Sequence, residues 1–254
     1  MEEKKYINYK ETKISYILNS MGNKRVLVMV HGFGMDNHER GNFDKLAKEL
    51  LKIGYDSIRI DMIGHGESEG DSRELTVKNS VEIVEQILSK YNYKDVSLLG
   101  SSHGGSVVSV YSVNKEIKNI ILWSPLLDLY NNIIIPSNMF TRDFLGKQGL
   151  KKIAENGYVE FGLSNHKIDN RVFEEASYLK PVDCLYRSKS NILLLHGDKD
   201  MMIPAEQSNK IVELNSRINY VKINNGTHCF YDDTFNEVLK LTLDFLKEHV
   251  WNTL

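Results

Sequence analysis

Apolar residues follow two spacings that alternate along this chain of 254 residues. Near the start they occupy alternate positions, and this pattern predicts an antiparallel hairpin or meander over residues 6–18 with a turn near residues 8–11. The run Val26–Val30 is continuously apolar, as expected for a strand that is covered on both faces. Further strands are predicted at 57–60, 96–99, 120–123, 191–196 and 220–223. Helical spacing of apolar residues predicts helices near 43–51, 77–88, 107–111, 211–214 and 238–250, the first of them ended by Gly54.

Alternation of strands and helices predicts an α/β fold, with a mostly parallel central sheet and helices on both of its faces. The length suits one large domain of this class. The alternation stops between about 125 and 190, where glycine and proline are scattered through an irregular stretch (Pro136, Gly146, Gly149, Gly157, Gly162 and Pro181). We therefore expect residues 1–124 and 191–254 to form the core domain and residues 125–190 to form an inserted cap. The alternative is a set of ordinary long loops, although connections of this length are rarely passive.

The most informative motif is Gly100-Ser101-Ser102-His103-Gly104, which lies between a predicted strand and a predicted helix. It matches the G-x-S-x-G pattern of a nucleophile elbow, a sharp turn that exposes the serine hydroxyl. A serine needs this exposure, and a neighbouring base, because its hydroxyl is a weak nucleophile. Such a turn brings Gly100 and Gly104 close together, so both must be small.

Two other glycine-rich sites fit the chain less well. A phosphate-binding P-loop needs Lys and then Ser or Thr after its last glycine, but Gly105 is followed by Ser106 and Val107. A dinucleotide fingerprint needs G-x-G-x-x-G, and neither the elbow nor Gly32-Phe33-Gly34 completes it.

An acylated serine also needs donors for the negative oxygen that forms during attack. The glycines of His31-Gly32-Phe33-Gly34 allow the backbone to fold back toward the sheet, so that the amide of Phe33 can point at this oxygen. The amide of His103, directly after the elbow serine, is the second candidate, and the helix dipole favours an anion there. We expect the ring of His31 to bind nearby backbone.

Candidates for the base and its orienting acid follow two later strands. Asp200 is the preferred acid in His196-Gly197-Asp198-Lys199-Asp200, and Asp198 is the alternative. His228, after the last predicted strand, is the candidate base. The order Ser102, Asp200, His228 is that of the α/β hydrolases. Each residue also follows the carboxyl end of a strand, where open α/β sheets bind ligands.

Over nearly its full length the chain resembles an α/β hydrolase. The segment Asp61–Ser68 is similar to the D-x-x-G-H-G-x-S turn of many such hydrolases, and we assign it a structural role in which Asp61 binds local amides. Within the superfamily the chain resembles bacterial cinnamoyl (feruloyl) esterases in the His-Gly-Phe loop, the single insertion, the acid turn and Thr227–Phe230. This resemblance implies a triad of Ser102, Asp200 and His228, with Phe33 and His103 as oxyanion donors. It also implies hydrolysis of hydroxycinnamoyl esters.

Several activities remain open on this triad. The motifs do not separate an esterase from a peptidase, a thioesterase or an acyltransferase, and a ligand-binding protein on a hydrolase fold is a further alternative. Aromatic residues of the insertion either line an aryl pocket or form the cap's own core, and we favour the core for any single one (Tyr130, Phe140, Phe144, Tyr158 and Phe161).

Composition limits the classes of partner that we expect for this protein. The formal charge of −2 gives no reason to expect nucleic acid, and the expected partner is a small-molecule ester. We expect no cofactor and no metal, no membrane span, no signal peptide and a cytoplasmic location. A homodimer is one of the oligomeric states that the sequence leaves open. It also leaves open a bridge between Cys184 and Cys229.

Overall fold

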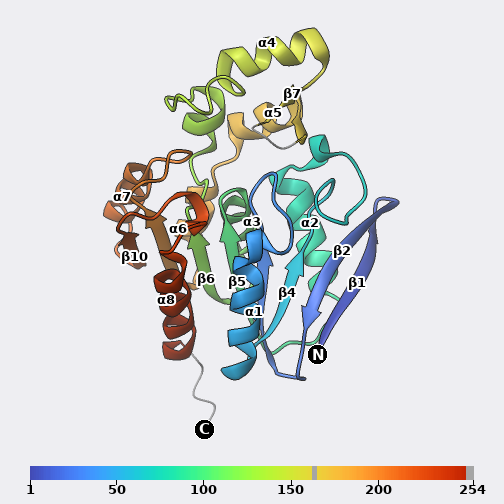
Figure 1. Ribbon diagram of the computed structural model, residues 1–254, viewed down its shortest axis with the longest axis vertical. Coiled ribbons are helices and arrows are strands. Elements are labelled where there is room, and N and C mark those ends of the chain that lie inside the picture. The colour runs from blue at the N-terminus through green and yellow to red at the C-terminus, as the bar shows by residue number, and fades with distance from the viewer. Residues whose placement is uncertain (162–164, 250–254) are drawn as a thin grey trace.

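An eight-stranded sheet forms the centre of the computed structural model, which describes residues 1–161 and 165–249 (Figure 1). Only the contacts of β1 with β2 and of β2 with β4 are antiparallel, and all other neighbouring pairs of this sheet are parallel. The predicted α/β fold with a mostly parallel sheet is therefore confirmed. In spatial order the strands are β1 (Glu2–Tyr9), β2 (Thr12–Asn19), β4 (Asp56–Ile60), β3 (Arg25–Val30), β5 (Asp95–Ser101), β6 (Ile117–Trp123), β9 (Asn191–Gly197) and β10 (Ile218–Ile223).

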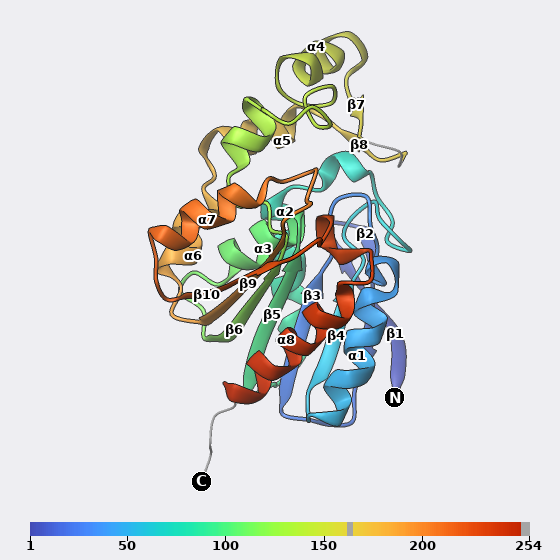
Figure 2. The same ribbon diagram turned by 60° about the vertical axis from the view of Figure 1, so that its left-hand side comes forward.

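Helices cover both faces of this sheet, as predicted (Figure 2). One face carries α1 (Asn42–Lys52) and α8 (Phe235–Glu248), and the other carries α2 (Val77–Leu88), α3 (His103–Tyr111), α6 (Pro181–Arg187) and α7 (Ala205–Glu213). Two apolar clusters fill the layers between helices and sheet. In β3, Val26, Val28 and Val30 belong to one cluster while Leu27 and Met29 belong to the other. This division explains why the strand has no polar face.

Local signals set the ends of several elements. Lys10 and Glu11, with φ of 46° and 69°, form the turn between β1 and β2. Gly54 has a φ of 77° just after α1, which is the left-handed position that favours glycine at the end of a helix. The last helix begins earlier than predicted, at Phe235, and Val250, its predicted end, lies outside the described residues.

The stretch 125–190 is more regular than its glycines and prolines indicate. Pro181 stands in the first turn of α6, where a missing N–H costs nothing. Gly149 lies inside α4, and glycine is needed at this position because a Cβ there would lie 2.3 Å from the carbonyl oxygen of Phe144. Gly162 lies outside the described residues. The elements before α6 are η3 (Tyr130–Ile134), α4 (Gly146–Asn156), β7 (Val159–Glu160), β8 (Lys167–Ile168) and α5 (Asn170–Tyr178).

These elements lie beyond the carboxyl ends of the parallel strands and are tied to the sheet domain there (Figure 1). The carboxylate of Glu175 in α5 accepts hydrogen bonds from the amides of Val77 and Lys78, at 2.7 and 2.9 Å, in the first turn of α2. The hydroxyl of Ser72 bonds both backbone groups of Lys167. The stretch is thus anchored at the sheet edge that carries the candidate site.

Candidate active site

Ser102 occupies a sharp turn between β5 and α3. Its φ of 49° and ψ of −113° lie outside the regions that a serine normally adopts. The surrounding backbone holds this conformation. The amide of Ser102 donates to the carbonyl of Trp123 at the end of β6, and its carbonyl accepts from the amides of Gly105 and Leu126, all at 2.9 Å. Strain that persists in this way is typical of functional sites.

Glycine is required on both sides of this turn. A Cβ on Gly100 would lie 2.3 Å from the carbonyl oxygen of Gly104, and a Cβ on Gly104 would lie 2.1 Å from that of Val30. Gly32, in the facing loop, would place a Cβ 3.2 Å from the Cβ of Ser102. The two loops therefore meet at van der Waals distance, with little room for a side chain between them.

The structure brings together three side chains that are far apart in the sequence. The Oγ of Ser102 lies 3.0 Å from Nε2 of His228, and Nδ1 of His228 lies 2.7 Å from Oδ2 of Asp200. Because Asp200 accepts from Nδ1, the neutral ring presents the lone pair of Nε2 to the serine hydroxyl. This arrangement allows the ring to remove the proton of the hydroxyl.

The turn after β9 holds Asp200 in place. Its Oδ1 accepts the amides of Met202 and Ile203, both at 2.8 Å, and its Oδ2 also lies 3.1 Å from Nε2 of His196. Asp198 instead accepts the amide of Asn225 at 2.7 Å and joins the turns that follow β9 and β10. Of the two carboxylates, only that of Asp200 forms a hydrogen bond with His228.

Asp200 and His228 each favour the charged form of the other. Burial raises the pKa of Asp200, but hydrogen bonds from His196 and His228 lower it by more, so this carboxyl stays ionised. Burial lowers the pKa of His228, whereas Cys229 and Asp200 raise it by more, to well above 6.5. Since burial also raises the pKa of the Cys229 thiol, which leaves it uncharged, we attribute the upward shift to the Asp200 carboxylate.

The loop after β3 lies beside the elbow. The ring of His31 donates from Nδ1 to the carbonyl of Gly32 and accepts the amide of Met62 at Nε2, so its predicted role in binding backbone is confirmed. Within the described part of the chain, neither the amide of Phe33 nor that of His103 donates a hydrogen bond. Burial lowers the pKa of the His103 ring to about 4, so the ring adds no charge at neutral pH.

The structural turn at Asp61–Ser68 is also confirmed. The carboxylate of Asp61 accepts hydrogen bonds from the backbone amide of Asn37 at 2.7 Å and from that of Glu67 at 3.1 Å. Gly66 lies so close that a Cβ there would be 2.1 Å from Oδ1 of Asp61.

Two residues behind the site escaped the sequence analysis as functional candidates. His196 contacts Asp200, and one feature of the sequence marks it, because it ends the apolar run of β9 two residues before Asp198. No such feature marks Glu39, because its contacts with Ser101 and Tyr231 join residues that are far apart in the chain.

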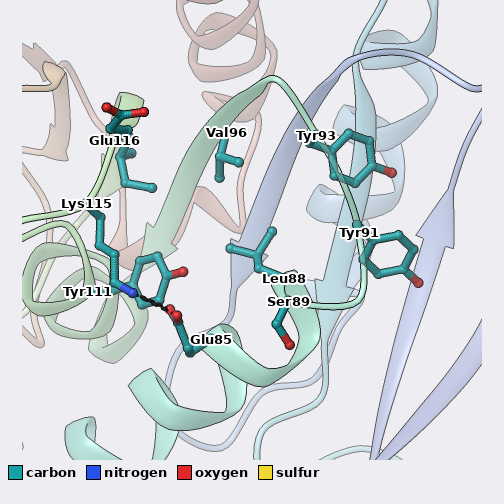
Figure 3. Close-up of a pocket in the computed structure, with 10 residues that line it drawn as sticks. Glu85, Leu88, Ser89, Tyr91, Tyr93, Val96, Tyr111, Lys115 and Glu116 are labelled. Atoms are coloured by element: carbon teal, nitrogen blue, oxygen red, sulfur yellow. Dashed lines mark hydrogen bonds and ion pairs between the residues drawn. The ribbon is translucent and has the colours of Figure 1, made fainter.

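The described residues include no group of three side chains that could hold a metal ion. Cys184 and Cys229 are both free, so the bridge that the sequence left open does not form. A hollow lined by Tyr91, Tyr93 and Tyr111 lies at the amino ends of β5 and β6, away from Ser102, and an ion pair of Lys115 with Glu85 crosses it (Figure 3). It is separate from the candidate active site.

Sheet order, elbow and insertion together define an α/β hydrolase. The chain belongs to the family described as serine aminopeptidase, S33, whose sequence profile matches residues 22–175. A probable serine hydrolase of Drosophila melanogaster is 30% identical over 103 residues, and a monoglyceride lipase of Rattus norvegicus is 29% identical over 185 residues. These matches cover 39% and 70% of this chain, and they span only 30% and 52% of the two relatives.

A solved structure extends the likeness to the whole fold. Est1E from Butyrivibrio proteoclasticus, determined with ferulic acid bound, superposes with a TM-score of 0.80 at 21% sequence identity. The match covers 96% of this chain and 98% of Est1E. The predicted resemblance to feruloyl esterases is thus confirmed at the level of the fold. None of the helices in the described residues has the length and apolar character needed to cross a membrane.

Proposed function

We propose that this protein is a serine hydrolase of carboxylic esters that works through an acyl-enzyme on Ser102. The observation that carries this proposal is the continuous hydrogen-bonded series from Ser102 through His228 to Asp200. A strained backbone turn that presents the hydroxyl, a base within hydrogen-bond reach and a buried acid behind the base are the parts that activate a serine.

In the proposed reaction, His228 takes the proton of Ser102 while the serine oxygen attacks the ester carbonyl. Asp200 holds the ring in the tautomer that can accept this proton and stabilises the charge that the ring gains. The protonated ring then gives its proton to the leaving alcohol. Water, activated by the same ring, releases the acid from Ser102.

The oxyanion of each tetrahedral intermediate is proposed to bind the amides of Phe33 and His103. Both amides are free of partners within the described chain, and His103 begins α3, so the helix dipole also favours an anion. Loss of one such donor typically slows hydrolysis by about 10²–10³-fold.

We further propose that residues 125–190 act as a cap and that the acyl group is small and aromatic. The ring of Phe161 lies 5.2 Å from that of Phe33 and 5.7 Å from that of Phe144, so a row of aromatic rings leads from the oxyanion loop into the cap. Est1E binds ferulic acid on the same fold. Tyr130 and Phe140, in contrast, are about half exposed.

An aminopeptidase is the second candidate, because that activity is in the description of the family. The triad serves either reaction, since esters and amides differ in the leaving group. A panel of p-nitrophenyl esters, hydroxycinnamoyl esters, acyl-CoA thioesters and aminoacyl anilides separates the candidates. Preferred turnover of hydroxycinnamoyl esters supports the proposal, and preferred turnover of aminoacyl anilides contradicts it.

The nucleophile is tested by replacing Ser102 with Ala. We expect the variant to fold normally and to lose turnover of p-nitrophenyl acetate, because no other hydroxyl in the described part of the chain hydrogen-bonds the ring of His228. A fluorophosphonate should label the unmodified protein at Ser102 and leave the variant unlabelled, as read by mass spectrometry. Turnover that survives in the variant would refute the assignment.

A further inference from the structure

Glu39 is a fully buried carboxylate that the proposed mechanism does not use. Its side chain has no exposed surface, although charged residues are rarely buried without a partner. It lies at the end of the loop that begins with His31, and its Oε1 is 3.7 Å from the point that a Cβ on Gly32 would occupy. The carboxylate therefore stands directly behind the meeting point of this loop and the elbow.

Three donors converge on its two oxygens. Oε2 accepts the amide of Gly32 at 3.1 Å, and Oε1 accepts the hydroxyls of Ser101 at 2.9 Å and Tyr231 at 2.5 Å. A carboxylate, which has only acceptors, satisfies such a set completely. These donors are the buried partners that make the position of the charge tolerable.

Each donor belongs to a different loop of the candidate active site. Gly32 directly precedes Phe33, whose amide is a proposed oxyanion donor. Ser101 directly precedes Ser102, and Tyr231 follows His228 by three residues. One carboxylate thus joins the oxyanion loop, the nucleophile elbow and the loop of the base.

The backbone at Glu39 has an unfavourable conformation that its surroundings hold in place. Glu39 and Arg40 both have left-handed conformations, with φ of 45° and 54°. Such conformations are unfavourable for these residues and persist only where the surroundings fix them. The same segment makes two further contacts with the loop of the base: the guanidinium of Arg40 lies 4.6 Å from the ring centre of Tyr231, and the side-chain amide of Asn42 donates to the carbonyl of Phe230.

We propose that Glu39 is a positioning residue of the hydrolytic reaction. Its carboxylate fixes the oxyanion loop, Ser102 and His228 relative to one another before the substrate binds. This inference rests on the proposed function. Rates of positioned reactions are sensitive to such alignment, and a displacement of about 1 Å can cost about 10²-fold.

The test replaces Glu39 with Gln, which keeps the shape of the side chain. The amide NH₂ of Gln must then face at least one of the three donors, so one contact is lost and the loops lose their common anchor. We expect kcat for p-nitrophenyl acetate, counted per fluorophosphonate-labelled Ser102, to fall by about 10–100-fold. KM should change little, because the alignment acts on the transition state.

Asp56→Asn is the matched control. Asp56 is also buried and also accepts several donors, among them Ser20 and the amide of Met21, but it begins β4 at the opposite end of the sheet. Its variant should lose stability and keep the kcat per labelled site of the unmodified protein.

Ser101→Ala and Tyr231→Phe each remove one donor and leave the carboxylate in place. Each should lower kcat per labelled site, and Tyr231→Phe should add little to Glu39→Gln, since both break one network. These two variants decide the question if Glu39→Gln does not fold. A normal kcat per labelled site in Glu39→Gln, or in both donor variants, overturns the inference about Glu39. Absence of labelling at Ser102 in the unmodified protein would instead refute the proposed function.

Discussion

At the scale of single residues, the site depends on groups held in unusual states. Ser102 keeps an unfavourable backbone conformation, and His228 is shifted toward its charged form by a carboxylate that is itself buried. Both conditions favour the proposed reaction. The serine oxygen is within hydrogen-bond distance of the proposed base, and the carboxylate of Asp200 is already placed to stabilise the charge that the ring gains during attack.

This electrostatic arrangement predicts the dependence of activity on pH. His228 acts as a base only when it is neutral, and the Asp200 carboxylate favours its protonated form and so raises its pKa. The acid limb of kcat/KM for a p-nitrophenyl ester should therefore have its midpoint no lower than about 6.5, the ordinary value of a histidine, with activity rising into alkaline pH. The rate of fluorophosphonate labelling should follow the same curve, as an independent measurement. A midpoint near pH 5 in either measurement would contradict this role of Asp200.

The two carboxylates of the turn after β9 provide a second prediction. Asp200→Asn should lower kcat by about 10⁴-fold, as the equivalent change does in serine proteases, because the ring loses its orienting charge. Asp198→Asn is the matched control and should change kcat far less, because among the described residues the carboxylate of Asp198 accepts a hydrogen bond only from the backbone amide of Asn225. Steady-state kinetics with one aryl ester compare the two. Equal losses would mean that the acid has been assigned wrongly.

At the scale of elements, the strands were predictable because each buries both of its faces, and this requirement leaves a continuous apolar run such as Val26–Val30. The helices of the cap were not predictable by the same reasoning. α4 contains Gly149, which reads in the sequence as a helix breaker, but a Cβ there would lie 3.0 Å from Cζ of Phe173 in α5, so glycine is needed for close packing of the two helices. Tertiary contact overrides local preference there.

The elbow gives the element-scale prediction. Replacing a helical glycine by alanine normally gains about 1 kcal/mol, but a Cβ on Gly104 would lie 2.1 Å from the carbonyl of Val30. The clash dominates, and Gly104→Ala should lower the free energy of unfolding by at least about 3 kcal/mol, as measured by urea denaturation. Gly157→Ala is the control, since a Cβ there has no neighbour within 4 Å and costs only the left-handed strain of about 1–2 kcal/mol. A smaller loss at Gly104 than at Gly157 would refute this account.

At the scale of the whole molecule, the candidate triad could be predicted because each member follows the carboxyl end of a strand, and parallel strands bring these ends to one edge. Glu39 could not be predicted in this way. It meets Ser101 and Tyr231 across 62 and 192 positions of the sequence, and no motif marks it. The same holds for the contact of Glu175 with α2, which spans 98 positions to Val77.

The hydrogen bonds from α2 to Glu175 predict how the stretch 125–190, the proposed cap, is attached to the sheet domain. Glu175→Ala leaves two amides of α2 without their acceptor and should lower the free energy of unfolding by about 1–3 kcal/mol. Hydrogen exchange should also become faster in α5 and in the first turn of α2, while the central strands keep their protection.

The matched control is the neighbouring Glu174→Ala, because Glu174 is exposed and, among the described residues, its hydrogen bonds stay within its own helix. If the two variants had equal stability and equal exchange, Glu175 would not anchor the cap.

The proposed cap is also joined to the loop that supports Asp200, the proposed catalytic acid. The side-chain amide of Asn138 donates to the carbonyls of Met201 and Met202, and the amide of Met202 is one of the two that hold Asp200. A chimera that carried the cap of a relative would alter the support of the acid as well as the walls around the substrate. Under the proposed function, the choice of substrate and the rate of turnover are therefore coupled, and a grafted segment would need its own partner for the backbone at 201–202 before its new preference could be measured fairly.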